Sequence, residues 1–353
     1  MRRMRQMELR GAAAACALAL GLVIGTVPGA GPASAQDKTF ELKLSHWVPP
    51  SHPLQKALED WGSSVEQDSG GTIKYKVYPA QQLGKAFDHY DMARDGIAEL
   101  TYVNPGYQPG RFPIFDAVNL PFMVANGKAG TGAVDDWYRN YAAAEMKDVK
   151  YCFAFVHDPG SFHSRSKKIV LPSDIAGMKI RPATAPIASL VTSLGGTNVQ
   201  AAAPEVRDVI ERGVADAVTF PWGSVVLFGI DKVTKYHIDA PLYTTGFVWV
   251  MNKDTYAAMS PSQQKVIDNH CNRAWAERVA GPWADFEHAG IAKIKAEPDH
   301  EVYTLTNEQL AAWKKASEPV AQSWSAAVKK AGADPDAALA ALRTDLAKSN
   351  SGY

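Results

Sequence analysis

The sequence is poor in cysteine and carries no excess charge of either sign. Three cysteines in 353 residues are too few for a fold held together mainly by disulfide bonds. Lys and Arg number 37, Asp and Glu also number 37, and no long basic run follows residue 10, which argues against binding nucleic acid through a broad basic face. No long apolar run follows the N-terminal region, which excludes a polytopic membrane protein.

The short motifs of several enzyme classes are also missing. There is no G-x-S-x-G, no P-loop, no G-x-G-x-x-G and no C-x-x-C. His46 and His52, then His157 and His163, are spaced six apart, wider than usual for zinc ligands and without a third ligand. We expect solvated or hydrogen-bonded loop histidines, with a metal role as the alternative. No cofactor is expected, and a secreted hydrolase has little support.

What is present is an ordinary globular composition. Hydrophobic residues make up 46% and charged residues 21%. At the usual domain size, this length predicts two domains or one large one.

The first 35 residues have the three parts of a secretory signal. Four arginines in the first ten residues precede the apolar segment GAAAACALALGLVIGTV, and Ala33-Ser34-Ala35 is a small-x-small end. We expect cleavage after Ala35 and an exported protein that begins at Gln36. A membrane anchor is the alternative, but the run is short and broken by prolines and glycines. Loss of four arginines and one glutamate would leave 33 basic and 36 acidic residues.

Two cysteines lie outside this segment. Cys152 lies in the apolar run YCFAFV, which favours a buried free thiol. A bridge between Cys152 and Cys271 is the alternative.

Strand and helix patterns alternate along the rest of the chain, which predicts an α/β fold with a largely parallel sheet. A long helical pattern runs from 260 to about 295, with a kink expected at Gly281-Pro282. The other predicted strands are 40–45, 73–79, 98–104, 150–157, 216–222, one around 247–250, and 301–305; the other predicted helices are 54–65, 82–96, 129–147, 187–194, 204–212, 306–330 and 335–348.

Arg181 is the sharpest single candidate for a binding residue. It ends a strand pattern, and Pro182 after it favours extended backbone. A guanidinium there can project into a cleft and pair with a carboxylate, although a surface salt bridge explains the residue equally well. Aromatic residues gather at strand ends and in loops, where open α/β sheets bind ligands: Trp47, Tyr102, Phe162, Phe220, Trp222 and Phe247. Together they indicate an apolar pocket with one charged anchor.

An ordered set of motifs resembles one known family. The segment Leu171–Arg181 matches a D-x-x-G-x-K-I-R pattern of the extracytoplasmic solute-binding proteins of TRAP (tripartite ATP-independent periplasmic) transporters. Ala217 departs from the glycine usual in that family. The other matching segments, in order, are Asp116–Phe122, Leu194–Thr197, Pro204–Val206, Glu211–Asp216, Met251-Asn252 and Ser260-Pro261.

The resemblance implies a type II periplasmic binding protein-like fold, with two α/β lobes, a ligand cleft between them and a long helix spanning both. On this basis residues 36–158 start lobe I, 159–246 form lobe II, 247–300 hold the return strand and the spanning helix, and 301–353 pack on the lobes. It also implies a periplasmic protein, not an enzyme, that delivers an organic acid to small and large membrane subunits.

The same resemblance assigns roles in the site. Arg181 is expected to pair with the ligand carboxylate. His163 and Asn104 are expected to supply further polar contacts, and Trp47, Tyr102, Phe220, Trp222 and Phe247 to line the remainder. So many rings favour an aromatic or other partly apolar monocarboxylate. A 2-oxo or hydroxy acid held with a cation is the alternative, sugar acids fit less well, and a binding lobe of a sensor is a third possibility.

Overall fold

The computed structural model describes residues 37–353. The expected signal segment and its cleavage after Ala35 lie outside these residues. Within residues 37–353 no helix is both long and apolar enough to cross a membrane.

Two separate sheets organise this part of the chain. The first, the sheet of lobe I, has the order β2-β1-β3-β10-β4. β1 pairs in parallel with β2 and β3, whereas β10 lies antiparallel between β3 and β4, so the sheet is mixed rather than largely parallel. Its strands are β1 (Phe40–Ser45), β2 (Ile73–Tyr78), β3 (Leu100–Val103), β4 (Lys150–Val156) and β10 (Gly246–Met251).

The second sheet, that of lobe II, has the order β11-β9-β5-β8-β6-β7. β6 is parallel to β7 and β8, and β5 is antiparallel to β8 and β9. Its strands are β5 (Ser161–Ser164), β6 (Lys179–Arg181), β7 (Thr197–Asn198), β8 (Ala217–Phe220), β9 (Tyr236–Asp239) and β11 (Glu301–Thr304). The expected α/β class with two lobes is confirmed, while the division of the chain at 158, 246 and 300 stays a prediction.

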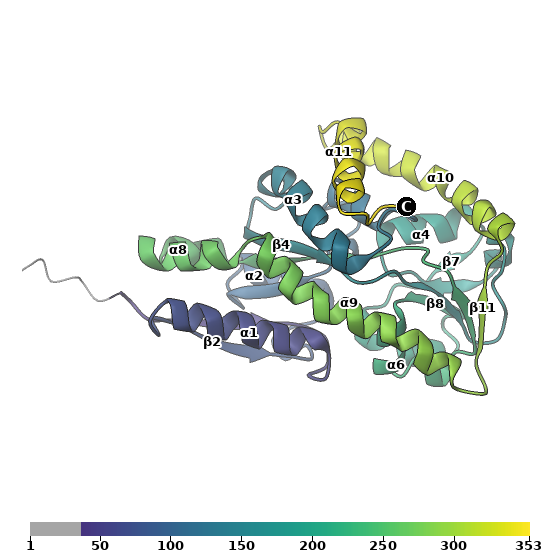
Figure 1. Cartoon of the computed structure of the whole chain (residues 1–353), viewed down its shortest axis with the longest axis horizontal. Helices are drawn as coiled ribbons and strands as arrows, with labels where there is room; N and C mark the ends of the chain where they lie inside the picture. Colours follow the sequence, from purple (N-terminus) through teal and green to yellow (C-terminus); the bar gives the residue numbers. More distant parts are fainter. Residues whose placement is uncertain (1–36) are drawn as a thin grey trace, which may run out of the picture. The chain divides into compact units, whose positions relative to one another are not determined.

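Helices cover both sheets, and one of them packs against both lobes. In Figure 1, α9 runs from α1 and α3 of lobe I toward α6 and β11 of lobe II, and it contacts all four elements. The helices are α1 (Pro53–Asp68), α2 (His89–Arg94), α3 (Gly127–Glu145), α4 (Ala185–Ser193), α5 (Val206–Glu211), α6 (Trp222–Leu227), α7 (Lys253–Ala257), α8 (Pro261–His270), α9 (Arg273–Lys295), α10 (Asn307–Lys330) and α11 (Pro335–Lys348).

The predicted helix 260–295 is wrong at one point, because α8 ends at His270 and α9 begins at Arg273. Asn272 starts α9 as its N-cap, and its side chain accepts a hydrogen bond from the backbone N–H of Trp275 at 3.1 Å. Pro282 lies inside α9, and the helix continues past it without interruption. A good N-cap residue therefore decides where this long helical pattern divides.

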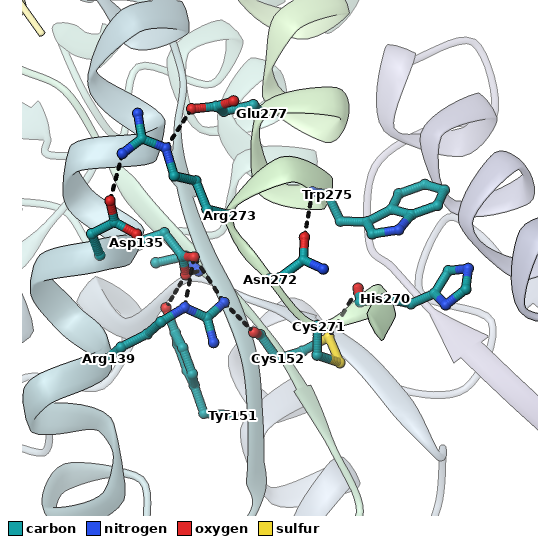
Figure 2. A network of polar contacts seen from close by, with 12 residues as sticks. Asp135, Arg139, Tyr151, Cys152, His270, Cys271, Asn272, Arg273, Trp275 and Glu277 are labelled. Atoms are coloured by element: carbon teal, nitrogen blue, oxygen red, sulfur yellow. Dashed lines mark hydrogen bonds and ion pairs between the residues drawn. A yellow bond between two sulfur atoms is a disulfide. The ribbon is translucent and has the colours of Figure 1, made fainter. Parts of the chain in front are cut away.

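The preference for a free thiol at Cys152 is also wrong. Cys152 of β4 forms a disulfide with Cys271, the residue at the break between α8 and α9 (Figure 2). The backbone carbonyl of Cys152 also accepts a hydrogen bond from Arg139 of α3 at 2.8 Å, and Arg139 pairs with the buried Asp135. This arrangement ties the start of α9 to the sheet of lobe I.

Candidate ligand-binding site

A cavity lined by buried side chains lies between the two lobes. The space free of protein atoms there, open solvent included, is about 370 Å³. Trp47, Asn104 and Phe247 line it from lobe I, Arg181 and Phe220 from lobe II, and Trp283 from α9. All of these side chains are buried, so the cavity is closed off by protein on several sides.

Arg181 brings a positive charge into this cavity. The residue is 2% exposed, and it ends β6 beside β8. Its Nε donates to the carbonyl of Ala201 at 2.8 Å, and its Nη1 lies 3.4 Å from the carbonyl of Thr219. Its Nη2 lies 3.1 Å from the hydroxyl of Tyr107. A guanidinium has five N–H groups, so one N–H on each terminal nitrogen is left over.

No acidic side chain of the described residues, 37–353, pairs with this guanidinium. Arg181 takes part in none of the ion pairs formed within residues 37–353, and its three protein acceptors are uncharged oxygens. A buried arginine is normally paired with an anion, because an unpaired charge in a low-dielectric site is costly. The site therefore offers two free N–H donors and an uncompensated positive charge, which together fit a carboxylate.

Tyr107 connects the two lobes at this point, and sequence reasoning did not identify it. It ends a short 3-10 turn (Pro105–Tyr107) that Asn104 caps by accepting a hydrogen bond from the N–H of Gly106 at 2.9 Å. The Tyr107 hydroxyl also accepts from the backbone N–H of Ala203 at 2.9 Å. The N-P-G-Y turn was a visible signal, since it fixes the position of Tyr107 three residues after Asn104.

Away from Arg181, aromatic rings enclose the cavity. Trp283 lies 5.0 Å from Phe247 and 5.0 Å from His52, measured between ring centroids. Trp47 lies 6.4 Å from Phe247, and His157 lies 5.7 Å from Trp283. We call this group the aromatic cage; its members are Trp47, His52, His157, Phe247 and Trp283, and all of them line the cavity.

Both histidines of the cage are uncharged. Burial lowers the pKa of His52 to about 3 and that of His157 to about 4. His157 uses both ring nitrogens within the protein: Nδ1 bonds the carbonyl of Asp158 at 2.5 Å, and Nε2 accepts from the N–H of Thr245 at 3.2 Å. The cage is therefore neutral, and the charge of the cavity is concentrated at Arg181.

A buried carboxyl holds the wall of the cavity to α9. Glu287 accepts from the backbone N–H of Ser224 at 2.8 Å, from its hydroxyl, and from Nε1 of Trp283 at 2.6 Å. Burial raises the pKa of Glu287 to about 7, although these donors act in the opposite direction. Ser224 and Trp283 both line the cavity, so Glu287 fixes two parts of its wall at once.

Five of the eight predicted site residues meet at this cavity: Arg181, Asn104, Trp47, Phe220 and Phe247. The structure does not bring the other three to its lining. Tyr102 lies behind Trp47 and stacks on it at 4.7 Å, and Trp222 packs edge-on against His163 at 4.9 Å. These rings support the lining rather than form it.

His163 requires a correction, because it lies in β5 rather than in a loop and faces a buried chain of histidines. Its Nε2 donates to the carbonyl of Phe220 at 2.9 Å, so its Nδ1 accepts from Nδ1 of His237 at 2.8 Å. His237 in turn accepts at Nε2 from Nδ1 of His300 at 2.8 Å. With both ring nitrogens used, His163 holds the carbonyl of Phe220 and is not placed to contact a ligand.

The remaining members of the lining were not predicted, since their positions depend on contacts between distant segments. In the sequence, Trp283 is one more apolar residue of a long helical pattern, and His52 looks like a loop histidine.

Within the part of the chain that the structure describes, no group of three or more His, Cys, Asp and Glu side chains is arranged to hold a metal ion.

Comparison with protein families gives a match over most of the chain. Residues 44–327 match the family described as bacterial extracellular solute-binding protein, family 7 (DctP). Solved structures of similar proteins adopt the same two-lobe fold of type II periplasmic binding proteins.

Three solved structures illustrate the likeness. A TRAP solute-binding protein from Rhodoferax ferrireducens T118, in complex with copurified benzoate, is 29% identical with a TM-score of 0.83, covering 88% of this chain and 99% of that one. A marine metagenome TRAP protein specific for aromatic acid ligands, with 3-hydroxybenzoate, is 31% identical with a TM-score of 0.82, covering 89% and 99%. A Bordetella bronchiseptica protein with bound mandelate is 28% identical with a TM-score of 0.81, covering 87% and 99%.

More distant structures hold other acids. A TRAP protein from Sulfitobacter sp. NAS-14.1 with bound β-D-galacturonate is 21% identical with a TM-score of 0.76, covering 86% of this chain and 99% of that one. A likeness at that identity shows the fold alone.

Proposed function

This chain belongs to family 7 of the bacterial extracellular solute-binding proteins, the binding components of TRAP transporters, and we propose that it captures an aromatic or other partly apolar monocarboxylate. The carboxylate pairs with Arg181, and the ring lies in the aromatic cage. The bound ligand is returned unchanged, since the protein binds and does not catalyse.

The observation that carries the proposal is the buried guanidinium without an anion. Arg181 keeps one free N–H on each terminal nitrogen, a geometry that suits two carboxylate oxygens. A neutral ligand would leave the buried positive charge uncompensated, and a cationic ligand would add a second charge. A single guanidinium matches one carboxylate, which supports a monocarboxylate.

The cage supports an aromatic body for that ligand. Its rings are neutral and buried, and they offer flat surfaces on which a planar ring can stack or pack edge-on. Relatives at 28–31% identity contain benzoate, 3-hydroxybenzoate and mandelate, each of which joins a carboxylate to an aromatic ring.

Ligand binding is coupled to lobe closure in this proposal. Arg181 belongs to lobe II and most of the cage to lobe I, so a ligand that touches both favours the closed arrangement by the difference in its affinity for the two states. The closed protein then docks, in the periplasm, on the small and large membrane subunits of the transporter and releases the acid to them.

The test is the chemical identity of the ligand. Calorimetric titration of the purified, ligand-stripped protein should give binding to benzoate and mandelate and none to glucuronate or galacturonate. Recovery of unaltered acid after denaturing the complex is expected, whereas a chemically changed acid would point to an enzyme. Binding of uronates alone, or binding that requires an added cation, would overturn the proposal.

A further inference from the structure

His52 is the cage residue that the proposed function leaves unexplained. It is 2% exposed, it lines the cavity, and it precedes α1 as the N-cap residue. Its ring lies edge-on to Trp283 at 5.0 Å and 6.0 Å from Phe286, both of α9. The residue is therefore fixed on two sides, by the helix it caps and by the helix that joins the lobes.

The position of its proton follows from that cap. The backbone N–H of Leu54 donates to Nδ1 of His52 at 3.1 Å, so Nδ1 has to be the unprotonated nitrogen. A neutral imidazole then carries its proton on Nε2, and burial keeps the ring neutral. Within residues 37–353 no protein group pairs with this Nε2–H.

An N–H that belongs to the cavity lining and has no protein partner is available to donate to a ligand. Two other groups of the lining, Nε1 of Trp47 and the hydroxyl of Tyr243, also lack a protein partner among the described residues, so a His52 variant is needed to tell the three donors apart. Both nitrogens of His157 are occupied, and the Ser224 hydroxyl is bonded to Glu287. Arg181 lies over the rings of Phe220 and Tyr107, whereas His52 packs against the ring of Trp283. The two donors therefore occupy different regions of the cavity wall.

We propose that His52 selects, among aromatic monocarboxylates, those whose ring carries a hydrogen-bond acceptor such as a hydroxyl, methoxy or keto oxygen. This inference rests on the proposed function. The carboxylate binds Arg181, and Nε2–H of His52 donates to the ring substituent. A methyl group of similar size leaves that N–H unpaired, so the site discriminates by polarity rather than by volume.

The first experiment uses the wild-type protein and matched pairs of ligands. Dissociation constants are measured by calorimetry for the ortho, meta and para hydroxybenzoates and for the corresponding methylbenzoates. At least one hydroxy isomer should bind about tenfold more tightly than its methyl counterpart. Equal affinities in all three pairs would overturn the inference while leaving the proposed function intact. If no benzoate derivative binds, the proposed function itself fails.

The second experiment withdraws the imidazole Nε2–H by shortening the side chain and keeps the helix cap. In His52→Asn, the amide oxygen can still accept from Leu54, because Asn is among the best N-cap residues. The variant should bind the hydroxy ligand and the methyl ligand with about equal affinity, so the preference is lost while the methyl ligand still binds. His46→Asn is the matched control, because His46 lies in the same loop, bonds Gln55 through Nε2 and does not line the cavity. A preference that persists in His52→Asn would contradict the inference.

Discussion

At the scale of single residues, the unusual feature is a positive charge held away from water without a carboxylate beside it. Arg181 is 2% exposed and bonds only uncharged oxygens. In the empty site this charge is poorly solvated, and the anionic ligand supplies the missing partner. Pairing of the ligand carboxylate with Arg181 therefore contributes to affinity and offsets the desolvation cost of the buried guanidinium.

Replacing this arginine should separate binding from stability. Arg181→Met removes the charge and keeps most of the volume, so affinity for the carboxylate ligand should fall by roughly 2–5 kcal/mol. The melting temperature of the ligand-free protein should stay the same or rise, because a costly buried charge is gone. Calorimetric titration and thermal unfolding of both proteins check this. Unchanged affinity for every anion tested would contradict the role of Arg181.

Arg181 could be predicted because its signal is local: a strand end, a following proline and a motif. The roles of Tyr107 and His163 could not. The Tyr107 hydroxyl meets Ala203 across 96 residues of sequence, and His163 finds its partners at Phe220 and His237. Only the folded arrangement of the two sheets decides that Tyr107 lines the cavity and that both ring nitrogens of His163 are hydrogen-bonded outside its lining.

At the scale of elements, the crossing of α9 and α6 allows no side chain at its centre. A Cβ built on Gly290 would overlap the backbone of Trp222 and Gly223. Two glycines thus let the helices approach closely, and this approach positions Ser224 and Trp283 in the cavity wall.

Alanine at two glycines of α9 tests the crossing. Gly290→Ala should destabilise the protein by about 1–3 kcal/mol and weaken ligand binding, because the two helices are forced apart. Gly281→Ala is the control, since a Cβ there meets only Lys128 at 3.8 Å. It should leave stability unchanged or raise it by up to about 1 kcal/mol through helix propensity. Urea denaturation gives both values, and equal effects at the two positions would disprove the close crossing.

The bridge between β4 and the start of α9 should matter for stability more than for binding. The disulfide joins residues 119 apart in sequence, and neither cysteine lines the cavity. Cys152→Ala combined with Cys271→Ala should lower the free energy of unfolding by about 2–5 kcal/mol. Urea denaturation with and without a reductant checks this: wild type should lose stability with reductant and the double variant should not. Affinity measured in native buffer should change little.

The elements themselves could largely be predicted from periodicity and caps, as in β1 and in α10 after Thr306. The predicted helix 82–96 shortened to a 3-10 turn (Ala86–Asp88) and α2. The break at Cys271 was missed because Val266, Ile267, Ala274 and Trp275 continue one apolar pattern across it. A single N-cap asparagine and a disulfide partner in another segment overrode that periodicity.

At the scale of the whole molecule, buried histidines make stability depend on pH. Burial lowers the pKa of His46, His89, His157 and His163 to about 4, that of His52 to about 3 and that of His237 to about 2. In the unfolded chain these groups titrate near 6.5 and bind protons that the folded chain excludes. Their contribution is therefore complete above about pH 6.5 and is lost as the pH falls below it. Burial raises the pKa of Asp116 and Glu287 to about 7. Their contribution to the free energy of unfolding therefore rises as the pH falls.

One variant isolates the histidine contribution. His237→Leu removes a group whose pKa is lowered by burial and by neighbouring His163 and His300. The variant should be less stable than wild type at about pH 7.5, because two hydrogen bonds are lost, and the difference should shrink at about pH 5. Urea denaturation at both pH values measures it. A difference that is constant or grows toward acid pH would contradict the neutral histidine chain.

The position of β10 in the first sheet has a consequence for the order of assembly. β10 comes from residues 246–251, yet it is the strand that joins β3 to β4. As a nascent chain lengthens, β3 and β4 each keep an edge without a partner until β10 is made, which comes after β5 to β9, five of the six strands of the second sheet. The first sheet is thus completed only after most of the second has been made, and a chaperone that shields those edges would act during that interval.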